Sequence, residues 1–584
     1  MKNINLFISP IKLMLQHAPV LTLLKIFQIV VIALLIPFNI FISQQVIDNI
    51  VYYLTYEGYI QHVIFWVSML LASSLITALF GGLFSNLIEV SIKRRINKRM
   101  SPGIMKKFIS MDYYCFENPE IQDTIELMGD RPQDTIYTIF NRVLRLVRII
   151  VSMIGICIVL LQAAWWFVAG FIVLFILATL LEMKSSSIYH DMMVSQTMDE
   201  RRKEYLENLL SEKSSLAELT IFGAVNFIKG KWNLYSVKVL KEKMKASRKG
   251  IKFTMFHMLL LRCWTAFTIF GLIALATQGN VTLGLFTALI VSAVSITDSI
   301  YAFSSEVDMI KMDYLLTGHY YKFMKFPETK FGTEKITGID TIRFDNVTFS
   351  YPDTEEVVLS NISFEVNGRN SIALVGENGA GKSTIIKLLC RLYTPDSGNI
   401  YINNVNLKDI DTESLQKSIA AVFQDFEKYT LTLRENVALG EILRINEDEA
   451  ILESLRKGLA NDFTDLDMNL GRIQEDGVDL SGGQWQRIAL ARGLFSSGNF
   501  IILDEPTASL DPMAESELYH GFVNTLKERG SLIVSHRLAS AKMADTILVL
   551  ANGCIAEQGT HDELIGKKGL YSEMYNTQSR WYNE

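Results

Sequence analysis

The sequence has few cysteines and no excess of positive charge. Its 584 residues include 56 Lys and Arg against 62 Asp and Glu, a formal net charge of −6. Nucleic-acid binding usually rests on a basic surplus, so this balance argues against DNA or RNA as a partner. The five cysteines are scattered, without a CxxC pair or a His at ligand spacing, which argues against a disulfide framework and a zinc site. Low-complexity segments and internal repeats are also absent, which excludes repeat architectures.

What the sequence does have is apolar length in its first half. Hydrophobic residues make up 49% and charged residues 20%, and the mean hydropathy is +0.22, which indicates a membrane protein. A bilayer core of ~30 Å needs about 20 apolar residues of helix. Almost all runs of that length lie before residue 305. The six predicted spans are 20–42, 63–84, 143–161, 163–181, 253–276 and 283–303.

The loops between these runs predict the orientation in the membrane. Residues 43–62, the turn near Gln162 and residues 277–282 contain no Lys or Arg, whereas the long loops 89–142 and 184–252 contain many. By the positive-inside rule the long loops and both termini are expected to be cytoplasmic. The long loops also show heptad-like apolar spacing, so we expect the membrane helices to continue into the cytoplasm. Residues 1–19 are expected to form an uncleaved elbow helix, because the run that follows is too long for a signal peptide.

A glycine-rich motif begins at residue 376. It fits the pattern G-x-x-x-x-G-K-S/T, with a strand-like segment at 371–375 before it and a helix-like segment at 384–390 after it, the context that a P-loop requires. Glycines let backbone amides curl around phosphates; Lys382 is predicted to reach the terminal phosphates and Ser383 to bind Mg²⁺. The predicted ATP-binding residues here are Gly376, Glu377, Asn378, Gly379, Ala380, Gly381, Lys382, Ser383 and Thr384.

An apolar segment at 500–503 ends in Asp504 and Glu505. Such a pair alone is more often a solvated turn. Together with a P-loop it predicts a buried strand whose carboxylates face a nucleotide. Asp504 would then hold Mg²⁺, and Glu505 would polarise the water that attacks the γ-phosphate.

Between these motifs lies Leu480-Ser481-Gly482-Gly483-Gln484, which resembles the signature motif of ABC transporter ATPases. The resemblance covers essentially the whole sequence, since six spans followed by one nucleotide-binding domain is the arrangement of an exporter-type half-transporter. It implies that the signature loop of one subunit closes over the ATP held by the P-loop of the other. Ser481, Gly482, Gly483 and Gln484 are therefore expected to bind ATP.

The resemblance extends to further positions. Tyr351 is similar to the aromatic residue that stacks on adenine, Gln424 to the glutamine that touches Mg²⁺, and His536 to the switch histidine that contacts the γ-phosphate. This adds His536 to Glu505 as a catalytic residue and Gln424 to Ser383 and Asp504 as a metal ligand. Four segments also resemble family elements: 509–511 the dimer-contacting D-loop, 475–479 the exporter-specific loop, 116–123 the coupling helix of peptide-type exporters, and 484–487 a sequence of bacteriocin exporters.

The resemblance implies an all-α six-helix transmembrane domain of ABC exporter type, followed by an α/β P-loop NTPase domain of ABC type. The expected domains are an elbow helix at 1–19, a transmembrane domain at 20–325, a linker at 326–340 and an ATP-binding cassette domain at 341–584. The expected cofactors are ATP and Mg²⁺. Because one chain has only six spans, we expect a homodimer with a second copy of itself, placed in the plasma membrane of a bacterium.

The expected function is ATP-driven export of a solute. A secreted or antimicrobial, lantibiotic-like peptide is the first choice, and a multidrug or lipid exporter is the alternative. An ATP-gated channel or regulatory sensor on the same scaffold is an alternative of another class. Such proteins often carry degenerate catalytic residues, and none of the expected residues is degenerate in this sequence. No Cys/His protease domain precedes the first span, so any leader cleavage is expected to need another protein.

Charged residues within the spans are costly unless they are paired or solvated. Arg262, midway along the fifth span, could line a substrate cavity or form an interhelical pair. Lys25, Arg145, Arg148 and Asp298 lie nearer the cytoplasmic ends of their spans, where pairing is the favoured interpretation.

Overall fold

The computed structural model describes residues 2–56, 59–129, 131–278, 281–329, 331–472, 475–506, 529–535 and 541–583. The chain forms two compact units. The helical unit comprises Met1–Ile109 and Asp123–Lys325, and the α/β unit comprises Ser110–Gln122 and Phe326–Glu584.

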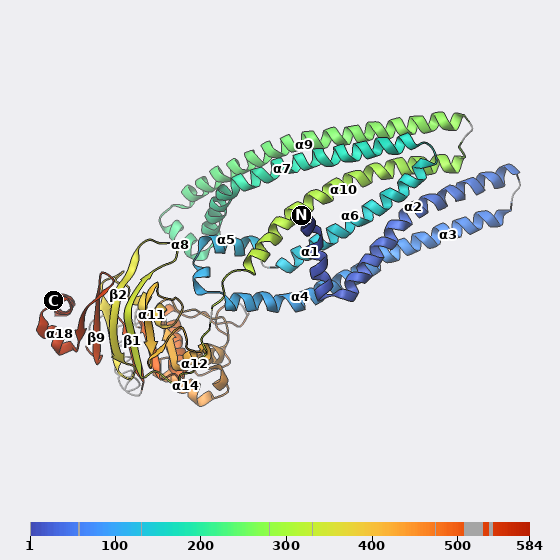
Figure 1. Ribbon diagram of the computed structural model, residues 1–584. Coiled ribbons are helices and arrows are strands. Elements are labelled where there is room, and N and C mark those ends of the chain that lie inside the picture. The colour runs from blue at the N-terminus through green and yellow to red at the C-terminus, as the bar shows by residue number, and fades with distance from the viewer. Residues whose placement is uncertain are drawn as a thin grey trace. The chain divides into compact units, whose positions relative to one another are not determined.

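Long helices run through the apolar segments of the chain, with shorter helices between them (Figure 1). They are α1 (Lys2–His17), α2 (Pro19–Tyr56), α3 (Ile60–Ala78), the π-helix η1 (Leu79–Phe84), α4 (Ser85–Ser110), α5 (Pro119–Met128), α6 (Pro132–Leu161), α7 (Trp165–Ser211), α8 (Lys213–Ile221), α9 (Val225–Thr277) and α10 (Leu283–Phe323). Among the described residues, six helical stretches are long and apolar enough to cross a membrane, which confirms the predicted number. They are Pro19–Tyr56, Ile60–Ser110, Pro132–Leu161, Trp165–Tyr189, Val225–Thr277 and Leu283–Ile310.

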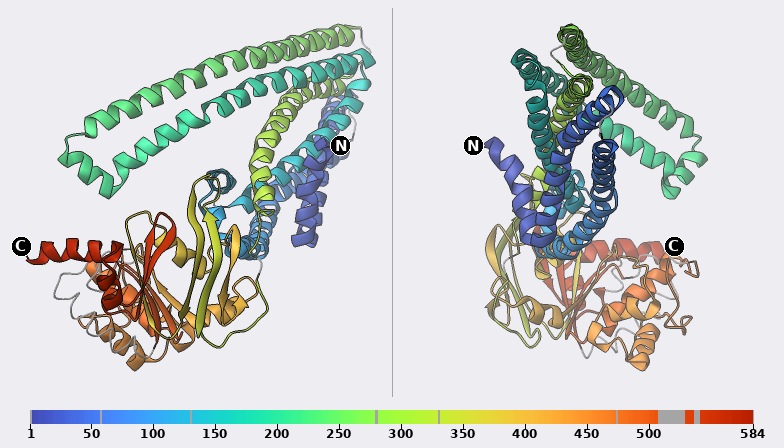
Figure 2. Two further views of the ribbon diagram at one scale, coloured as in Figure 1. Left: turned by 60° about the vertical axis from the view of Figure 1, so that its left-hand side comes forward. Right: turned by 90° about the vertical axis from the view of Figure 1, so that its right-hand side faces the viewer.

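Two features of these helices follow the sequence pattern. Only residues 162–164 separate α6 from α7, as the short predicted turn requires. Helices α7 and α9 extend well beyond their apolar segments and pack against each other along their length, as Figures 1 and 2 both show. The long, charged loop 184–252 is therefore mostly helix.

Ion pairs join the helices of this unit. Between α6 and α10, Arg142 Nε lies 2.6 Å from an Asp313 oxygen and Arg145 Nε lies 2.8 Å from a Glu306 oxygen. Of the two interpretations of Arg262, the structure shows the interhelical pair, because its Nη2 donates to Asp298 Oδ1 on α10 at 2.9 Å.

The α/β unit contains two sheets. Its strands are β1 (Thr341–Ser350), β2 (Val357–Asn367), β3 (Ser371–Gly376), β4 (Ser397–Ile402), β5 (Val405–Asn406), β6 (Ile419–Val422), β7 (Phe500–Asp504), β8 (Gly530–Val534), β9 (Thr546–Ala551) and β10 (Cys554–Gly559). The four-stranded antiparallel sheet has the order β2-β1-β4-β5, and the six-stranded sheet has the order β10-β9-β3-β8-β7-β6. Its helices are α11 (Lys382–Leu389), α12 (Thr412–Ser418), α13 (Leu433–Ala438), α14 (Asp448–Lys457), α15 (Gly482–Phe495), α18 (His561–Lys567) and α19 (Leu570–Asn583), with short 3₁₀ turns at Tyr113–Phe116 and Ile442–Arg444.

The central strands of the six-stranded sheet, β9, β3, β8 and β7, are buried on both faces. Because side chains alternate along a strand, Ile502 and Leu532 join the core that contains α11 and the four-stranded sheet, whereas Ile501 and Ile533 pack against α15. Burial on both faces explains why the sequence of β7 is continuously apolar.

The parallel strands of this sheet bring the predicted motifs to one edge. Strands β3, β8, β7 and β6 are parallel neighbours in that order, so their carboxyl ends lie along the same edge. The P-loop follows β3, Asp504 ends β7, and Gln424 lies two residues after β6. Ligands of α/β sheets bind at this edge, so the topology joins segments that are far apart in the sequence.

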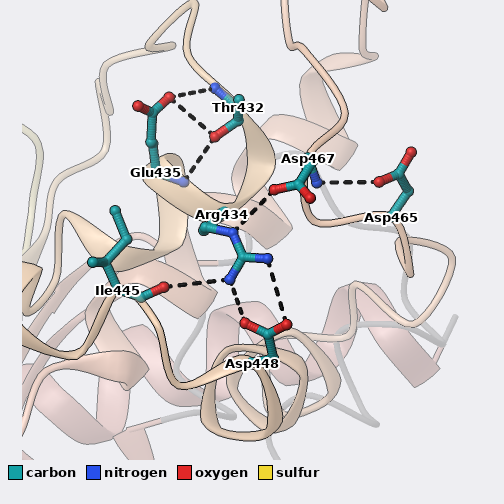
Figure 3. A network of polar contacts seen from close by, with 7 residues as sticks. All are labelled: Thr432, Arg434, Glu435, Ile445, Asp448, Asp465 and Asp467. Carbon is teal, nitrogen blue, oxygen red and sulfur yellow. Dashed lines mark hydrogen bonds and ion pairs between the residues drawn. The ribbon is translucent and has the colours of Figure 1, made fainter.

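Helices α13, α14 and α15 form a subdomain that an arginine helps to hold together (Figure 3). Arg434 donates to both Asp448 and Asp467, and the Nε···Oδ1 distance to Asp467 is 3.1 Å. Thr432 and Glu435 form a capping box at the start of α13. Leu433 and Trp485 share the subdomain's hydrophobic core, so α13 and α15 pack together there.

Candidate functional site

The loop between β3 and α11 adopts backbone angles that favour glycine. Gly379 and Gly381 have φ values of +80° and +101°. Side chains with a β-carbon rarely adopt this left-handed region. A β-carbon at Gly381 would also lie 2.5 Å from Leu359 Cδ2. The loop can therefore bring its backbone amides close to a phosphate, as the motif predicts.

Lys382 lies buried inside this loop. Its Nζ donates to the carbonyl oxygens of Gly376 and Glu377, both at 2.9 Å. An ammonium group has three N–H donors, so one is left for a ligand. Burial lowers the pKa of Lys382, an effect that the nearby carboxylates of Glu505 and Asp504 oppose. A phosphate would add the negative charge that this buried cation favours.

Asp504 is the buried carboxylate of the site. Its side chain is only 5% exposed, and Oδ1 has no hydrogen-bond partner among the described residues. Burial, reinforced by the charge of Glu505, raises its pKa from 3.8 to about 6, although a hydrogen bond with Ser383 acts in the opposite direction. A buried, incompletely satisfied carboxylate of this kind is suited to bind a cation.

Glu505 follows directly and has an unusual backbone. Its φ of +46° is in the left-handed region, and its N–H donates to the Val534 carbonyl at 3.0 Å on the neighbouring strand. A non-glycine residue in this region stores of order 1–3 kcal/mol, and such strain is concentrated at functional sites. The turn directs the chain away from the strand at the point where a catalytic carboxylate is expected.

The residues of this edge fit a magnesium ion. Ser383 supplies a hydroxyl group beside Asp504, whose buried Oδ1 lacks a partner. Mg²⁺ is commonly held by one or two protein oxygens together with substrate phosphates and waters. Within the described parts of the chain no three His, Cys, Asp or Glu side chains gather as a metal site.

Tyr351 lies against the start of α11. Its hydroxyl is 3.1 Å from Thr384 Oγ1, and Lys387 Nζ lies 5.1 Å from the centre of its ring. The contact with Thr384 places this aromatic ring beside the P-loop, as the prediction of an adenine-stacking residue requires.

The signature motif caps α15. Ser481 Oγ accepts from the Gln484 N–H at 3.3 Å, and Gln484 Oε1 accepts from the Ser481 N–H at 2.9 Å, which forms a capping box. Ser481 and Gly482 are exposed. One turn further on, buried Gln486 donates to the Pro506 carbonyl at 2.9 Å. The start of α15 is thus tied to the segment that follows Glu505.

The comparison with protein families identifies this arrangement. Residues 359–508 match the family model described as ABC transporter. The chain carries the ATP-binding domain of an ABC transporter. The matched region includes the P-loop, the signature motif and the strand that ends at Asp504.

Relatives of the transporter are similar along nearly the whole chain. The subtilin transport ATP-binding protein SpaT of Bacillus subtilis is 29% identical over 580 residues, covering 94% of this chain and 91% of the relative. An ATP-dependent lipid A-core flippase of Blochmanniella pennsylvanica is 28% identical over 538 residues, covering 88% of each chain. The structure of a bacterial Atm1-family ABC exporter with ATP bound aligns with a TM-score of 0.80 at 20% identity, over 97% of this chain and 98% of that one.

These comparisons confirm the fold class and the ATPase activity. The transporter has six apolar helices followed by an α/β nucleotide-binding domain, the fold of the exporter structure. Its ATP-binding domain hydrolyses ATP to drive transport. It is a multi-pass membrane protein, and half-transporters of this kind generally work as dimers.

Not every predicted site residue of the transporter is assembled. Gln424 is exposed, and its side chain makes no hydrogen bond to any described residue, although the neighbouring Asp425 is near enough to raise the pKa of Asp504. In the described part of the chain, no hydrogen bond or ion pair joins the signature residues to the P-loop. His536 and the D-loop segment 509–511 lie outside the described residues.

The structure adds contacts that the sequence analysis missed. In the α/β unit, the carboxylate of Glu117 accepts from the Tyr393 hydroxyl and pairs with Lys387 Nζ at 3.3 Å. Asn118 in the same segment donates to Asp353. Burial lowers the pKa of Lys387, but Tyr351 and Glu117 outweigh this effect and the pKa is raised. Lys387 therefore links the segment at 110–122 to the aromatic ring beside the P-loop.

Proposed function

We propose that this ABC transporter is a homodimer that exports a lantibiotic-like peptide across the plasma membrane of a bacterium. The observation that carries the proposal is its similarity to a lantibiotic transport protein, the subtilin transporter, over 580 residues. That length includes the six apolar helices, where a substrate must bind, as well as the ATPase domain. The similarity to the lipid A-core flippase also includes both parts, so a lipid exporter is the second candidate.

The proposed domains keep the boundaries predicted from the sequence. These are an elbow helix at 1–19, a transmembrane domain at 20–325, a linker at 326–340 and an ATP-binding cassette domain at 341–584. The absence of Lys and Arg from three of the loops supports an arrangement with both termini and the ATPase domain in the cytoplasm.

The nucleotide site supports the following roles. Tyr351 stacks on adenine, the P-loop amides bind the phosphates, and Lys382 donates its remaining N–H to the terminal phosphates. Ser383 and Asp504 would hold Mg²⁺, and Gln424 would become a further ligand when its segment moves towards the ion. When bound, the ion neutralises charge on the phosphate oxygens. Glu505 accepts a proton from the attacking water, and His536 contacts the γ-phosphate.

The signature motif supports the homodimer. Ser481 and Gly482 are exposed, and a β-carbon at Gly482 would meet no atom within 4 Å. This surface is open to the ATP of a second subunit. Because one chain carries every expected element, two copies would form two complete sites.

ATP binding would then supply the work of transport. Changing a two-state equilibrium from 1:99 to 99:1 needs about 5.5 kcal/mol of differential binding, which two phosphate sites that close together can provide. Hydrolysis at Glu505 would separate the ATPase domains again and reset the transporter.

The test uses full-length protein in inside-out proteoliposomes with ATP. Subtilin, a lipid A-core lipid and a fluorescent dye are offered separately, and both ATPase stimulation and accumulation in the vesicle lumen are measured. We expect stimulation and uphill accumulation with the peptide, and neither with a Glu505→Gln control. Stimulation by the lipid alone would favour a flippase. Equilibration without accumulation would indicate an ATP-gated channel and contradict export.

A further inference from the structure

A groove lies between α7 and α9 in the helical unit, at the cytoplasmic end of the apolar segments. Its volume is about 660 Å³. Four apolar side chains and two lysines line it: Leu181 and Ile188 on α7, and Lys249, Lys252, Phe253 and Phe256 on α9. The groove therefore has an apolar wall and a cationic end.

The depth of the groove follows from helix geometry. Helix α7 begins at Trp165 and α9 ends at Thr277, next to loops without Lys or Arg, so these ends face outward. At a rise of 1.5 Å per residue, Leu181 lies about 24 Å and Phe256 about 32 Å from these ends, and Lys249 lies about 42 Å away. A bilayer has a hydrocarbon core of ~30 Å and is about 40–45 Å thick with its headgroups. If these ends lie at the outer headgroup surface, Leu181 and Phe256 lie within the inner half of the hydrocarbon and Lys249 lies among the inner headgroups.

The cations at this end form no ion pair with the acidic residues that the structure describes. On the same helix, Lys238 pairs with Asp199 at 2.6 Å and Lys243 with Glu200 at 2.5 Å. In contrast, five neighbouring cations form no ion pair with any described residue: Lys241, Lys245, Arg248, Lys249 and Lys252. They line a second, adjoining hollow of about 330 Å³ together with Met244.

The described side chains of α7 form no ion pair with these cations. Glu182 contacts other residues of α9, because its carboxylate accepts from Thr254 at 3.1 Å and lies 3.6 Å from His257 Nδ1. Lys184 adds another cation, with Nζ 5.0 Å from the centre of the Phe253 ring. A cluster of unpaired cations at headgroup depth attracts an anion, and the adjoining aromatic wall is suited to an acyl chain.

We propose that this groove binds an anionic phospholipid of the cytoplasmic leaflet. Its phosphate would lie between Lys249 and Lys252, and an acyl chain would run along Phe253, Phe256 and Leu181 towards the hydrocarbon. The order of charge and apolar surface along the groove matches the order within a phospholipid. A free phosphate would not use the aromatic wall, and a cationic peptide would be repelled by the lysines. The site is separate from the nucleotide site and does not depend on the identity of the exported solute.

The test is native mass spectrometry of full-length protein titrated with phosphatidylglycerol or phosphatidylcholine. Because each lysine near the surface contributes about 1 kcal/mol of attraction to an anionic lipid, we expect phosphatidylglycerol to bind roughly thirty-fold more tightly. The double variant Lys249→Gln/Lys252→Gln should lose this preference. The matched variant Lys229→Gln/Lys231→Gln, which removes two charges far along the same helix, should keep it. Phe256→Ala should weaken both lipids.

Four results would overturn the proposal. The first is equal binding of the two lipids by the wild-type protein. The second is an unchanged preference in the Lys249→Gln/Lys252→Gln variant, which would show that the lipid binds elsewhere. The third is dissociation of that variant into monomers, which would assign the groove to a subunit contact. The fourth is displacement of phosphatidylglycerol by inorganic phosphate at equal concentration, which would assign the groove to a free anion. Size-exclusion chromatography and circular dichroism of each variant verify assembly and folding.

Discussion

The buried carboxylate of Asp504 should destabilise the ATPase domain whenever magnesium and nucleotide are absent. Burial raises its pKa from 3.8 to about 6. A difference of one unit between the folded and unfolded pKa values corresponds to about 1.4 kcal/mol. The ionised carboxylate therefore lowers the free energy of unfolding by about 3 kcal/mol. Asp504→Asn removes this charge and keeps an oxygen that can accept from Ser383. A new unsatisfied amide N–H would offset about 1 kcal/mol of the gain.

The assay is scanning calorimetry of the full-length transporter in EDTA without nucleotide. A net gain of about 2 kcal/mol should raise the unfolding temperature of the ATPase domain by about 4–8 °C at pH 8. Because the folded pKa is the higher one, the folded state holds its proton more tightly, and wild-type stability falls as the pH rises from about 4 to above 6. The variant does not titrate at this position. The difference in unfolding temperature between the variant and the wild type should therefore reach its full size at pH 8 and nearly vanish at pH 4.5.

Two comparisons make this prediction refutable. Asp425→Asn, which changes an exposed carboxylate on the neighbouring segment, should shift the unfolding temperature by no more than about 1–2 °C. Adding Mg²⁺ and a non-hydrolysable ATP analogue should reverse the order, because only the wild type gains the binding energy of the ion. An unfolding temperature of Asp504→Asn that is unchanged or lower at pH 8, or a difference independent of pH, would refute the reasoning.

Three further substitutions test the other contacts. Glu505→Gln should keep the affinity for a fluorescent ATP analogue but lower ATP turnover at least ~100-fold, and near-normal turnover would contradict its catalytic role. Glu117→Gln breaks the ion pair with Lys387. Basal ATPase activity should stay within about twofold of wild type, while transport per ATP falls in the same vesicles. Equal losses of ATPase activity and transport would point to a folding defect. Gln486→Ala removes the buried hydrogen bond to Pro506 and should cost about 1–2 kcal/mol of stability in calorimetry, with a lower ATPase rate; wild-type values of both would show that the contact is dispensable.

The parts of the fold that were predictable depend on local chemistry. Span length follows from the thickness of the bilayer, so the six apolar runs were sufficient to count the membrane helices. The P-loop is a short segment whose glycines and lysine act within eight residues. The strand-loop-helix context predicted for it is present, with β3 ending at Gly376 and α11 beginning at Lys382.

The contacts that were not predictable join distant segments. Glu117 contacts Lys387 and Tyr393 across about 270 residues of sequence, and no periodicity or motif marks such a pairing. Gln486 was noted only within a stretch that resembles bacteriocin exporters, and its hydrogen bond to Pro506 depends on how α15 packs on the sheet. Arg262 had two interpretations because a sequence does not reveal which helices are neighbours.

The sequence by itself therefore determined the membrane helices, the nucleotide chemistry and the family, because hydrophobic length and motif spacing are local properties of the chain. Tertiary structure alone decided which groups share an environment. It brought the carboxyl ends of β3 and β7 to one edge, buried Asp504 enough to raise its pKa to about 6, paired Arg262 with Asp298, and placed unpaired lysines beside an apolar groove. Desolvation and charge pairing depend on distances in space, and only the folded chain sets those distances.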